Sequence, residues 1–260
     1  MAHVIFAQEM YFALQSTQVL SAYLKKAGHT TDVAIGSPSD IVKYCKEHKP
    51  DIIAFSVLTS YRNHMLATVD ELKESNTEAI LIAGGYDITF MPQILRNSNL
   101  DIICVGEGGD PFIELCNSID KGKDWRSLEI GNLHIKQLDG TVKKNPMRYW
   151  LMNMDETPFD DRDIYNNKDS YFKIVPFTQV LAGRGCPYPC TYCFNDGYKK
   201  IHIAAGMKGK EYTNLRSVEH VIEELKMLED KYGSKFFFFN DSTLTYNPKW
   251  IIKFCEEYIK

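Results

Sequence analysis

The residues best suited to chemistry in this chain are three cysteines in one short stretch, Cys186, Cys190 and Cys193. Their spacing, C-x3-C-x2-C, allows them to bind three irons of a 4Fe–4S cluster and leaves the fourth iron without a protein ligand. Most iron–sulfur clusters are closed by four cysteine thiolates. An open iron can bind another molecule, so this spacing indicates a cluster that takes part in catalysis.

Two other interpretations of these cysteines stay open. A structural zinc site normally has four Cys or His ligands in two pairs; His202 could be the fourth ligand, but no second C-x2-C pair is present. The thiols could also be buried without a metal, as cysteines often are. The remaining cysteines have no ligand spacing and are predicted to pack in the core: Cys45, Cys104, Cys116 and Cys255.

The cysteine stretch is predicted to be a loop that follows a buried strand over residues 177–181. Functional loops of βα folds follow the carboxyl ends of strands, so this position suits a site. Gly183 and Gly185 let the backbone turn tightly and approach inorganic sulfur. Pro187 and Pro189 stiffen the loop, so the thiols need less ordering when a metal binds.

A second βα unit is predicted after the cysteine loop. Ser217 is suited to cap a helix that carries an apolar stripe and ends at Gly233. The next strand, residues 236–239, stops at Asn240 and Asp241, and the sequence ends within a further helix. Two strands cannot complete a parallel barrel or an open sheet, so we expect the sequence to be C-terminally truncated.

The first half of the sequence alternates short apolar strands with amphipathic helices. Strands are predicted at residues 3–6, 31–35, 51–55, 79–83 and 101–105. Helices are predicted at residues 16–27, 39–48, 64–75 and 111–119. Short apolar runs between polar or glycine residues are typical of buried parallel strands. The pattern predicts a doubly wound, flavodoxin-like α/β sheet that binds ligands at the carboxyl edge of its strands.

The predicted domain organisation has three parts. Residues 1–127 form a Rossmann-type domain, residues 128–170 a hairpin and linker, and residues 171–260 the start of the second βα series. The hairpin is predicted from two short strands on either side of Asp139 and Gly140, a turn pair typical of hairpins. The polar, proline-containing sequence that follows it predicts the linker.

The composition limits the class of protein. The chain has 260 residues, of which 44% are hydrophobic and 25% charged, as is usual for a soluble globular protein. The net charge of −4 provides no general basic field, so no nucleic-acid partner is expected. We find no signal-peptide pattern and no apolar run near the ~20 residues of a membrane span. The seven cysteines do not form a secreted disulfide pattern, so we expect a reducing cytoplasm.

The cysteine motif resembles the signature of the radical SAM superfamily, with Tyr192 as the aromatic residue just before the last cysteine. The resemblance implies a partial (β/α) barrel in which the three cysteines ligate the cluster and the open iron binds S-adenosylmethionine (SAM). In that family the reduced cluster cleaves SAM to a 5′-deoxyadenosyl radical, which abstracts a hydrogen atom. Asn240 and Asp241 stand where the family contacts the SAM amino group, although the Gly-Gly-Glu of many members is absent here.

The first half resembles the cobalamin-binding domain found in a large branch of the same superfamily. Ser56 and Leu58 match its S-x-L motif, and Gly84 and Gly85 match its G-G motif. Tyr11 stands where D-x-H-x-x-G would supply a histidine. The resemblance therefore implies that cobalt is bound without a protein histidine below it.

Three residues after the fifth predicted strand, Gly106, Glu107 and Gly108, also resemble this branch and are predicted to contact the cofactor. The alternative is that the glycines of both motifs serve only as βα turns. A dinucleotide site is less favoured, because the third glycine of G-x-G-x-x-G is missing.

The two resemblances together imply a cobalamin-dependent radical SAM enzyme that methylates an unreactive carbon. Its partners would be a small-molecule or natural-product substrate and an electron donor such as flavodoxin or ferredoxin. Two alternatives stay open. One is an enzyme of the same branch that performs cyclisation or oxidation without methyl transfer, and the other is a non-catalytic iron–sulfur or corrinoid-binding protein.

Overall fold

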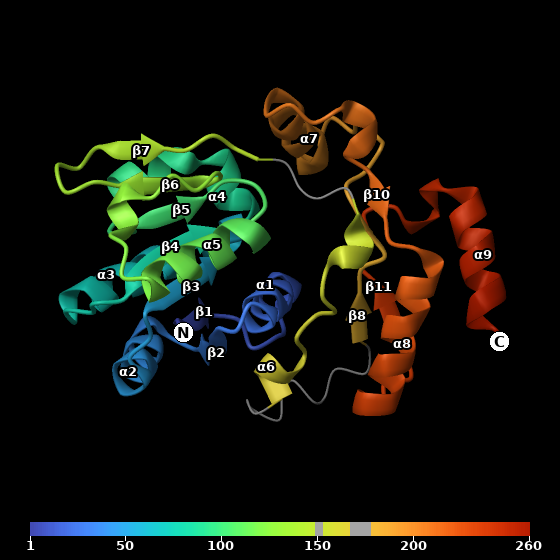
Figure 1. Ribbon diagram of the computed structural model, residues 1–260, viewed down its shortest axis with the longest axis horizontal. Helices are drawn as coiled ribbons and strands as arrows, with labels where there is room; N and C mark the ends of the chain where they lie inside the picture. The colour runs from blue at the N-terminus through green and yellow to red at the C-terminus, as the bar shows by residue number, and fades with distance from the viewer. Residues whose placement is uncertain (149–152, 167–177) are drawn as a thin grey trace. The chain divides into compact units, whose positions relative to one another are not determined.

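The computed structural model describes residues 1–148, 153–166 and 178–260 (Figure 1). The chain divides into two compact units. The first contains Met1–Arg148 and Asp160–Phe172, and the second contains Tyr149–Phe159 and Lys173–Lys260. The predicted boundary after residue 170 and the first residue of the strand predicted at 177–181 lie outside the described residues.

A seven-stranded sheet organises the first unit, in the order β2-β1-β3-β4-β5-β6-β7. The strands are β1 (His3–Gln8), β2 (Thr30–Ile35), β3 (Ile52–Ser56), β4 (Ile80–Gly84), β5 (Ile102–Cys104), β6 (Leu133–Lys136) and β7 (Val142–Lys144). Strands β1 to β5 are parallel and have the 2-1-3-4-5 order of flavodoxin-like folds. The predicted doubly wound α/β class is confirmed.

Four helices of the first unit begin and end close to the predicted positions: α1 (Gln15–Lys26), α2 (Pro38–His48), α3 (Arg62–Glu74) and α5 (Gly109–Asp120). Two short helices, α4 (Tyr86–Phe90) and α6 (Asp163–Asn166), were not predicted. The start of α2 illustrates the local cause. The Ser37 hydroxyl accepts a hydrogen bond from the Asp40 N–H, and the Asp40 carboxylate accepts one from the Ser37 N–H, which forms a capping box.

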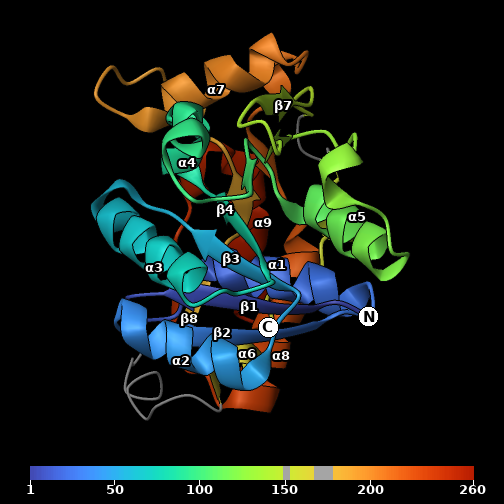
Figure 2. The same cartoon turned by 90° about the vertical axis from the view of Figure 1, so that its left-hand side faces the viewer.

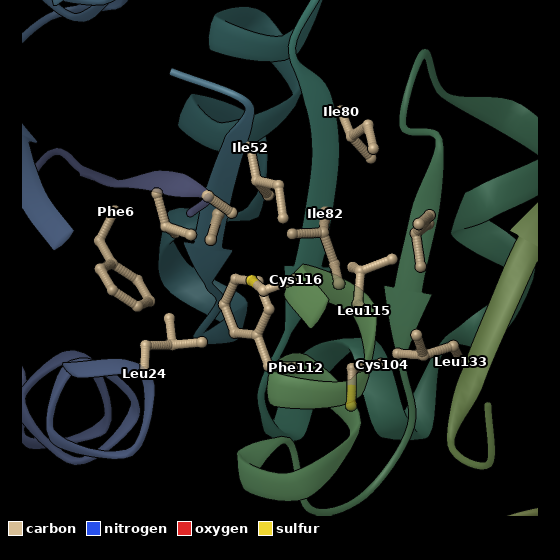
Figure 3. Close-up of a cluster of buried hydrophobic side chains, with 14 of the residues drawn as sticks. Phe6, Leu24, Ile52, Ile80, Ile82, Cys104, Phe112, Leu115, Cys116 and Leu133 are labelled. Atoms are coloured by element: carbon tan, nitrogen blue, oxygen red, sulfur yellow. The ribbon is translucent and has the colours of Figure 1, made fainter. Parts of the chain in front are cut away.

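The core of the first unit lies on both faces of its sheet. In Figure 2, α3 and α5 lie on opposite sides of the strands. On one face, Phe6, Ile52 and Ile82 of the strands pack with Leu24 of α1 and Phe112 of α5 (Figure 3). The intervening strand residues pack on the other face with α2, α3 and α4. Burial on both faces explains why these strands have nearly continuous apolar sequences.

The predicted hairpin is present, but the structure does not separate it from the first sheet. Strand β6 pairs antiparallel with β5, and β7 pairs antiparallel with β6. Of the predicted linker, residues 153–159 belong to the second unit and residues 160–166 to the first. The prediction grouped the hairpin with the linker because only its local turn signal, and not its pairing with β5, has a sequence pattern.

The second unit contains two short strand pairs and three longer helices in its described part. These elements are β8 (Thr178–Val180), β9 (Gly183–Arg184), α7 (Phe194–Ala204), β10 (Asn214–Leu215), α8 (Val218–Tyr232), β11 (Phe237–Phe239) and α9 (Pro248–Tyr258). Strands β8 and β11 are parallel, and β9 and β10 are antiparallel. As predicted, the Ser217 hydroxyl caps α8, and Gly233 ends it with a left-handed φ of 66°.

Short 3-10 helices complete the described structure: Thr59–Tyr61, Pro92–Asn97, Trp125–Ser127, Met154–Glu156, Gly209–Glu211 and Leu244–Tyr246. Among the helices that the structure describes, none has the length and apolar character needed to cross a membrane.

Candidate cofactor sites

The three predicted cluster ligands lie in the loop between β9 and α7. Cys186, Cys190 and Cys193 are free thiols with half-buried side chains. Cys193 is the N-cap residue of α7, and its N–H donates a 3.0 Å hydrogen bond to the carbonyl oxygen of Cys190. The N-terminus of an 11-residue helix favours negative charge, which suits thiolates that ligate an anionic cluster. The loop therefore fits the group that the motif predicts.

A site for a single metal ion would need a different arrangement of side chains from a site for an iron–sulfur cluster. Within the described ranges, no three His, Cys, Asp or Glu side chains converge on a point where they could hold one metal ion. The thiolates of an iron–sulfur cluster bind different irons, so they do not need to converge. His202, considered as a fourth zinc ligand, is fully buried in α7, with its ring 4.6 Å from the ring of Tyr198.

Gly185 allows the cysteine loop to pass close to a neighbouring segment. Its φ is +77°, and a Cβ atom built on it would lie 2.0 Å from the carbonyl oxygen of Tyr212. Tyr212 is itself buried, and its hydroxyl donates to the carbonyl oxygen of Asn195. Glycine is therefore required at position 185 by backbone packing, independently of any contact with inorganic sulfur.

The segment after β11 contacts the cysteine loop at one point and the residues that flank it at two. The Asp241 carboxylate accepts a 3.0 Å hydrogen bond from the Ala182 N–H, just before the loop. The Ser242 hydroxyl accepts a 3.1 Å bond from the side chain of Asn195, just after the loop. Thr243 Oγ1 lies 3.4 Å from Cys186 Sγ, within the loop. We call residues 241–243 the anchoring segment, because these contacts hold both ends of the cysteine loop and its first thiol.

The contacts of Asp241 bear on its predicted role. Burial raises the pKa of this carboxyl group, although hydrogen bonds from the backbone of Ala182 and Gly183 favour its charged form. Asp241 is thus already engaged by the backbone that leads into the cysteine loop. Asn240, the other residue predicted to contact SAM, is exposed, and so is Tyr192, the cofactor-binding residue predicted from the cysteine motif, with 92% of its surface accessible.

Arg216 is a buried residue near the loop that the sequence did not single out. Its guanidinium donates to the Leu181 carbonyl oxygen at 2.9 Å and to the Glu224 carboxylate at 2.5 Å. Its backbone N–H donates to Ala182, and its backbone carbonyl oxygen accepts from the indole N–H of Trp250. Arg216 therefore links the chain before the cysteine loop to α8 and α9.

The S-x-L and G-G motifs lie at the carboxyl edge of the first sheet. Ser56 ends β3, and its hydroxyl lies 2.8 Å from the hydroxyl of Ser16 at the start of α1. Leu58 is exposed, as is Tyr11 in the loop after β1. Strands β1 and β3 are neighbours in the sheet, and the strand order reverses between them. Flavodoxin-like folds bind ligands at the carboxyl edge at this point. The predicted S-x-L residues and Tyr11 thus share one edge.

The two glycines at the end of β4, Gly84 and Gly85, meet different structural requirements. A Cβ atom on Gly84 would make only ordinary contacts with Cys104. Gly85 has a φ of +102°, and a Cβ atom there would lie 2.8 Å from the carbonyl oxygen of Val57. The Val57 N–H also donates to the Gly84 carbonyl oxygen. The G-G motif therefore lets the loops after β3 and β4 approach each other closely.

An ion pair with a buried carboxylate joins the two helices that follow these loops, α3 and α4. Asp87, at the start of α4, has an almost fully buried carboxylate, which accepts from Arg62 Nε at 2.7 Å and from Thr59 Oγ1 at 2.8 Å. The hydrogen bond from Arg62 lowers the pKa of Asp87 below its ordinary value. The pair fixes the position of the loop that contains Leu58. Because Asp87 and Arg62 lie outside both motifs, no sequence pattern predicted this pair.

The residues after β5 are also constrained by the local structure. Gly106 has a φ of +83°, and a Cβ atom there would lie 2.7 Å from the side chain of Met147. The Glu107 carbonyl oxygen accepts a 2.7 Å hydrogen bond from the side chain of Asn132. Gly108 has room for a Cβ atom. These residues border the same edge of the sheet, because β5 is parallel to β4.

Tyr165, which is far from the loop after β1 in sequence, holds this loop in place through hydrogen bonds. This buried residue of α6 donates its hydroxyl to the Gln8 side chain at 2.6 Å and accepts from the Leu14 N–H. Gln8 in turn donates to the carbonyl oxygens of Met10 and Phe12. Burial raises the pKa of Tyr165 to about 12, so the hydroxyl keeps its hydrogen. The loop that contains Tyr11 is thus held by residues that carry no motif.

The cysteines outside the loop differ among themselves. Cys45, Cys104 and Cys116 are buried, and burial raises the pKa of each thiol to about 12. The prediction that they pack in the core is confirmed. Cys255, which was predicted to be a core residue as well, is exposed. It lies on α9, where the apolar stripe that packs inward contains Trp250 and Phe254.

Comparison with known proteins relates the first unit to a cofactor-binding family. Residues 16–116 match the B12 binding domain family. An uncharacterized methyltransferase of Pyrococcus horikoshii is 32% identical over 213 residues, which are 81% of this chain and 44% of that protein. An anaerobic magnesium-protoporphyrin IX monomethyl ester cyclase of Rubrivivax gelatinosus is 26% identical over 254 residues, 93% of this chain and 43% of that protein. The chain thus spans less than half the length of these relatives.

A solved structure has the same fold. It is OxsB, a cobalamin-dependent S-adenosylmethionine radical enzyme, with aqua-cobalamin and S-adenosylmethionine bound. It superposes with a TM-score of 0.77 and 20% sequence identity over 100% of this chain and 37% of that protein. Residues 16–116 therefore match a B12 binding domain, as the resemblance of the first half predicted, and the chain shares the fold of this solved structure.

Proposed function

We propose that the chain is the cobalamin-binding and cluster-binding part of a radical SAM enzyme that methylates an unreactive carbon of a small molecule. The observation that carries the proposal is the combination of a B12 binding domain with three half-buried thiols in one loop. When bound, the cluster and SAM would supply reductive SAM cleavage, and cobalamin would supply the methyl group. A one-electron donor such as flavodoxin or ferredoxin would be a partner of the whole protein.

The residues of this chain would bind and orient these groups. Cys186, Cys190 and Cys193 would hold the cluster, and the exposed Tyr192 would lie beside it. Asn240 and the backbone near Asp241 would contact SAM. At the first sheet, the loops that contain Ser56, Leu58, Gly84, Gly85 and Gly106 to Gly108 would contact the corrinoid. Tyr11 would take the position of the histidine in D-x-H-x-x-G and would not ligate the metal.

A second candidate is a radical SAM enzyme of the same branch that does not transfer a methyl group. The similarity to a cyclase of Rubrivivax gelatinosus favours it. The mass of the product of the whole protein separates the two, because methylation adds a methyl group and cyclisation does not.

The first experiment tests the cluster. The chain is reconstituted anaerobically with iron and sulfide, and the reduced sample is examined by electron paramagnetic resonance (EPR) with and without SAM. We expect a 4Fe–4S signal that changes when SAM is added. Cys190→Ser should lower bound iron to near background, and the matched variant Cys255→Ser, at an exposed cysteine outside the loop, should retain it. Equal iron in both variants would contradict the proposed ligands.

The second experiment tests the corrinoid. Binding of hydroxocobalamin is measured by equilibrium dialysis. Leu58→Asp places a charge at the proposed contact and should weaken binding at least tenfold. Leu138→Asp is the matched control, because Leu138 is exposed in the β6–β7 turn, away from the S-x-L and G-G loops. A chain that binds no corrinoid, or two variants with equal affinity, would contradict the proposed site.

A further inference from the structure

The hydroxyl group of Thr243 lies between two acceptors. Its Oγ1 is 3.4 Å from Cys186 Sγ and 2.7 Å from the carbonyl oxygen of Ser242. A threonine hydroxyl has a single hydrogen to donate. It can therefore donate to the sulfur or to the carbonyl oxygen, but not to both at full strength.

The choice between the two acceptors depends on the state of Cys186. As a free thiol, Cys186 can donate its own S–H to Thr243 Oγ1 while the hydroxyl donates to Ser242, so both bonds form. A thiolate that ligates iron has no hydrogen and can only accept. Hydrogen bonds to charged acceptors are stronger than those to neutral ones. Ligation thus favours rotation of the Thr243 hydroxyl toward the sulfur.

Thr243 is held in place for this contact by its neighbours. The residue before it, Ser242, is tied to the largely buried side chain of Asn195, and Asp241 is tied to the Ala182 N–H. These bonds span the two ends of the cysteine loop. Little backbone ordering is then needed when the hydroxyl turns, so the entropic cost of the new bond is small.

We propose that Thr243 is a positioning residue that donates a hydrogen bond to the cluster-bound sulfur of Cys186 and raises the reduction potential of the cluster. This inference rests on the proposed function, because it requires a cluster on the three cysteines. Reduction adds one negative charge, part of which resides on the sulfurs. A donor to sulfur therefore stabilises the reduced cluster more than the oxidised one.

Redox titration of the reconstituted chain, followed by EPR, tests this inference. Thr243→Val has nearly the shape of threonine but lacks the hydroxyl, and Thr243→Ser keeps the hydroxyl. At a fixed potential we expect the ratio of reduced to oxidised cluster to fall about tenfold in Thr243→Val, a shift of about 59 mV for one electron. Thr243→Ser should stay close to the unmodified chain. Iron per chain is measured in each sample.

The outcomes separate this inference from the proposed function. If the unmodified chain binds no cluster, the proposed function fails at its first step and the inference fails with it. If it binds a cluster and Thr243→Val has an unchanged potential, only the inference is overturned. If Thr243→Val binds no iron, Thr243→Ala is titrated instead, with the same criterion. Loss of iron from both, with retention in Thr243→Ser, supports the positioning role; loss from Thr243→Ser as well overturns it.

Discussion

The carboxyl edge of the first sheet and the cysteine loop of the second unit are held in different ways. At the first edge, the loop after β4 touches the backbone at Val57 through Gly85, and the buried Asp87 carboxylate binds Arg62. The cysteine loop also has close backbone packing, at Gly185, and a buried ion pair beside it, between Arg216 and Glu224. In addition, the anchoring segment, whose side chains are half-buried or exposed, holds the flanks of the loop by hydrogen bonds. Both regions therefore depend on close backbone packing, and the cysteine loop depends in addition on polar contacts of less buried side chains.

This difference indicates which amino-acid substitutions each region can tolerate. Backbone packing and a buried ion pair leave no room for substitution, but they keep their geometry without a ligand. The hydrogen bonds of the anchoring segment cost less to lose than close backbone packing, and they can change partners when a ligand binds. We therefore expect substitutions at the first edge to affect folding most, and substitutions in the anchoring segment to affect the cluster most.

The largest expected effect comes from Gly85→Ala. Its φ of +102° and the 2.8 Å approach to Val57 should together cost about 2–5 kcal/mol of unfolding free energy. Gly28→Ala is the matched control, because Gly28 has a φ of +92° but nothing within 4 Å of a Cβ atom, so only about 1–2 kcal/mol is expected. Hydrogen exchange of β3 and β1 peptides in urea measures both. Equal costs would show that the close approach to Val57 is unimportant.

A smaller effect is expected from Asp87→Asn, about 2–3 kcal/mol, because Arg62 loses its buried charged partner. The lowered pKa of Asp87 means that its stabilisation is fully present above the ordinary aspartate value of about 3.9 and is lost as pH falls through the folded-state value. The difference in unfolding free energy between the unmodified chain and the variant should therefore shrink below pH about 4.

The pH dependence is measured by urea unfolding at a series of pH values. Glu78→Gln, at an exposed carboxyl group, is the control for removing one negative charge and should have little effect. A difference for Asp87→Asn that stays constant down to pH 3 would contradict the role of the ion pair.

The smallest effect on stability is expected from Asp241→Ala, about 1–2 kcal/mol, because the Ala182 N–H loses its acceptor. The effect on the cluster should be larger, with a clear loss of iron per chain after reconstitution. Asp230→Ala, at an exposed position at the end of α8, should leave both unchanged. Full iron binding by Asp241→Ala would show that the anchoring segment does not prepare the loop.

Local patterns made the fold largely predictable. Each strand of the first sheet from β1 to β5 is a short apolar run, because helices cover both faces, and the predicted ranges differ from the structure by only a few residues. The cysteine loop was located from its spacing alone. In both cases the chemical signal lies within a few residues of sequence.

Contacts between distant polar residues could not be predicted. Tyr165 and Gln8 are 157 residues apart, and Thr243 and Cys186 are 57 apart. Such a pair has no periodicity and no composition of its own, so one sequence gives no reason to join its members. The same limit applies to the hydrogen bond from the Ala182 N–H to the Asp241 carboxylate, whose residues are 59 apart in sequence.

The unequal burial of the seven cysteines has a consequence for how oxidants and alkylating agents attack the chain. Thiolates are the reactive form, and burial leaves Cys45, Cys104 and Cys116 almost wholly protonated at neutral pH. Iodoacetamide should therefore modify the loop thiols and Cys255 first, and a bound cluster should leave Cys255 as the principal target. Air damage would then be concentrated at the thiols that hold the iron, while the core of the first sheet stays chemically intact.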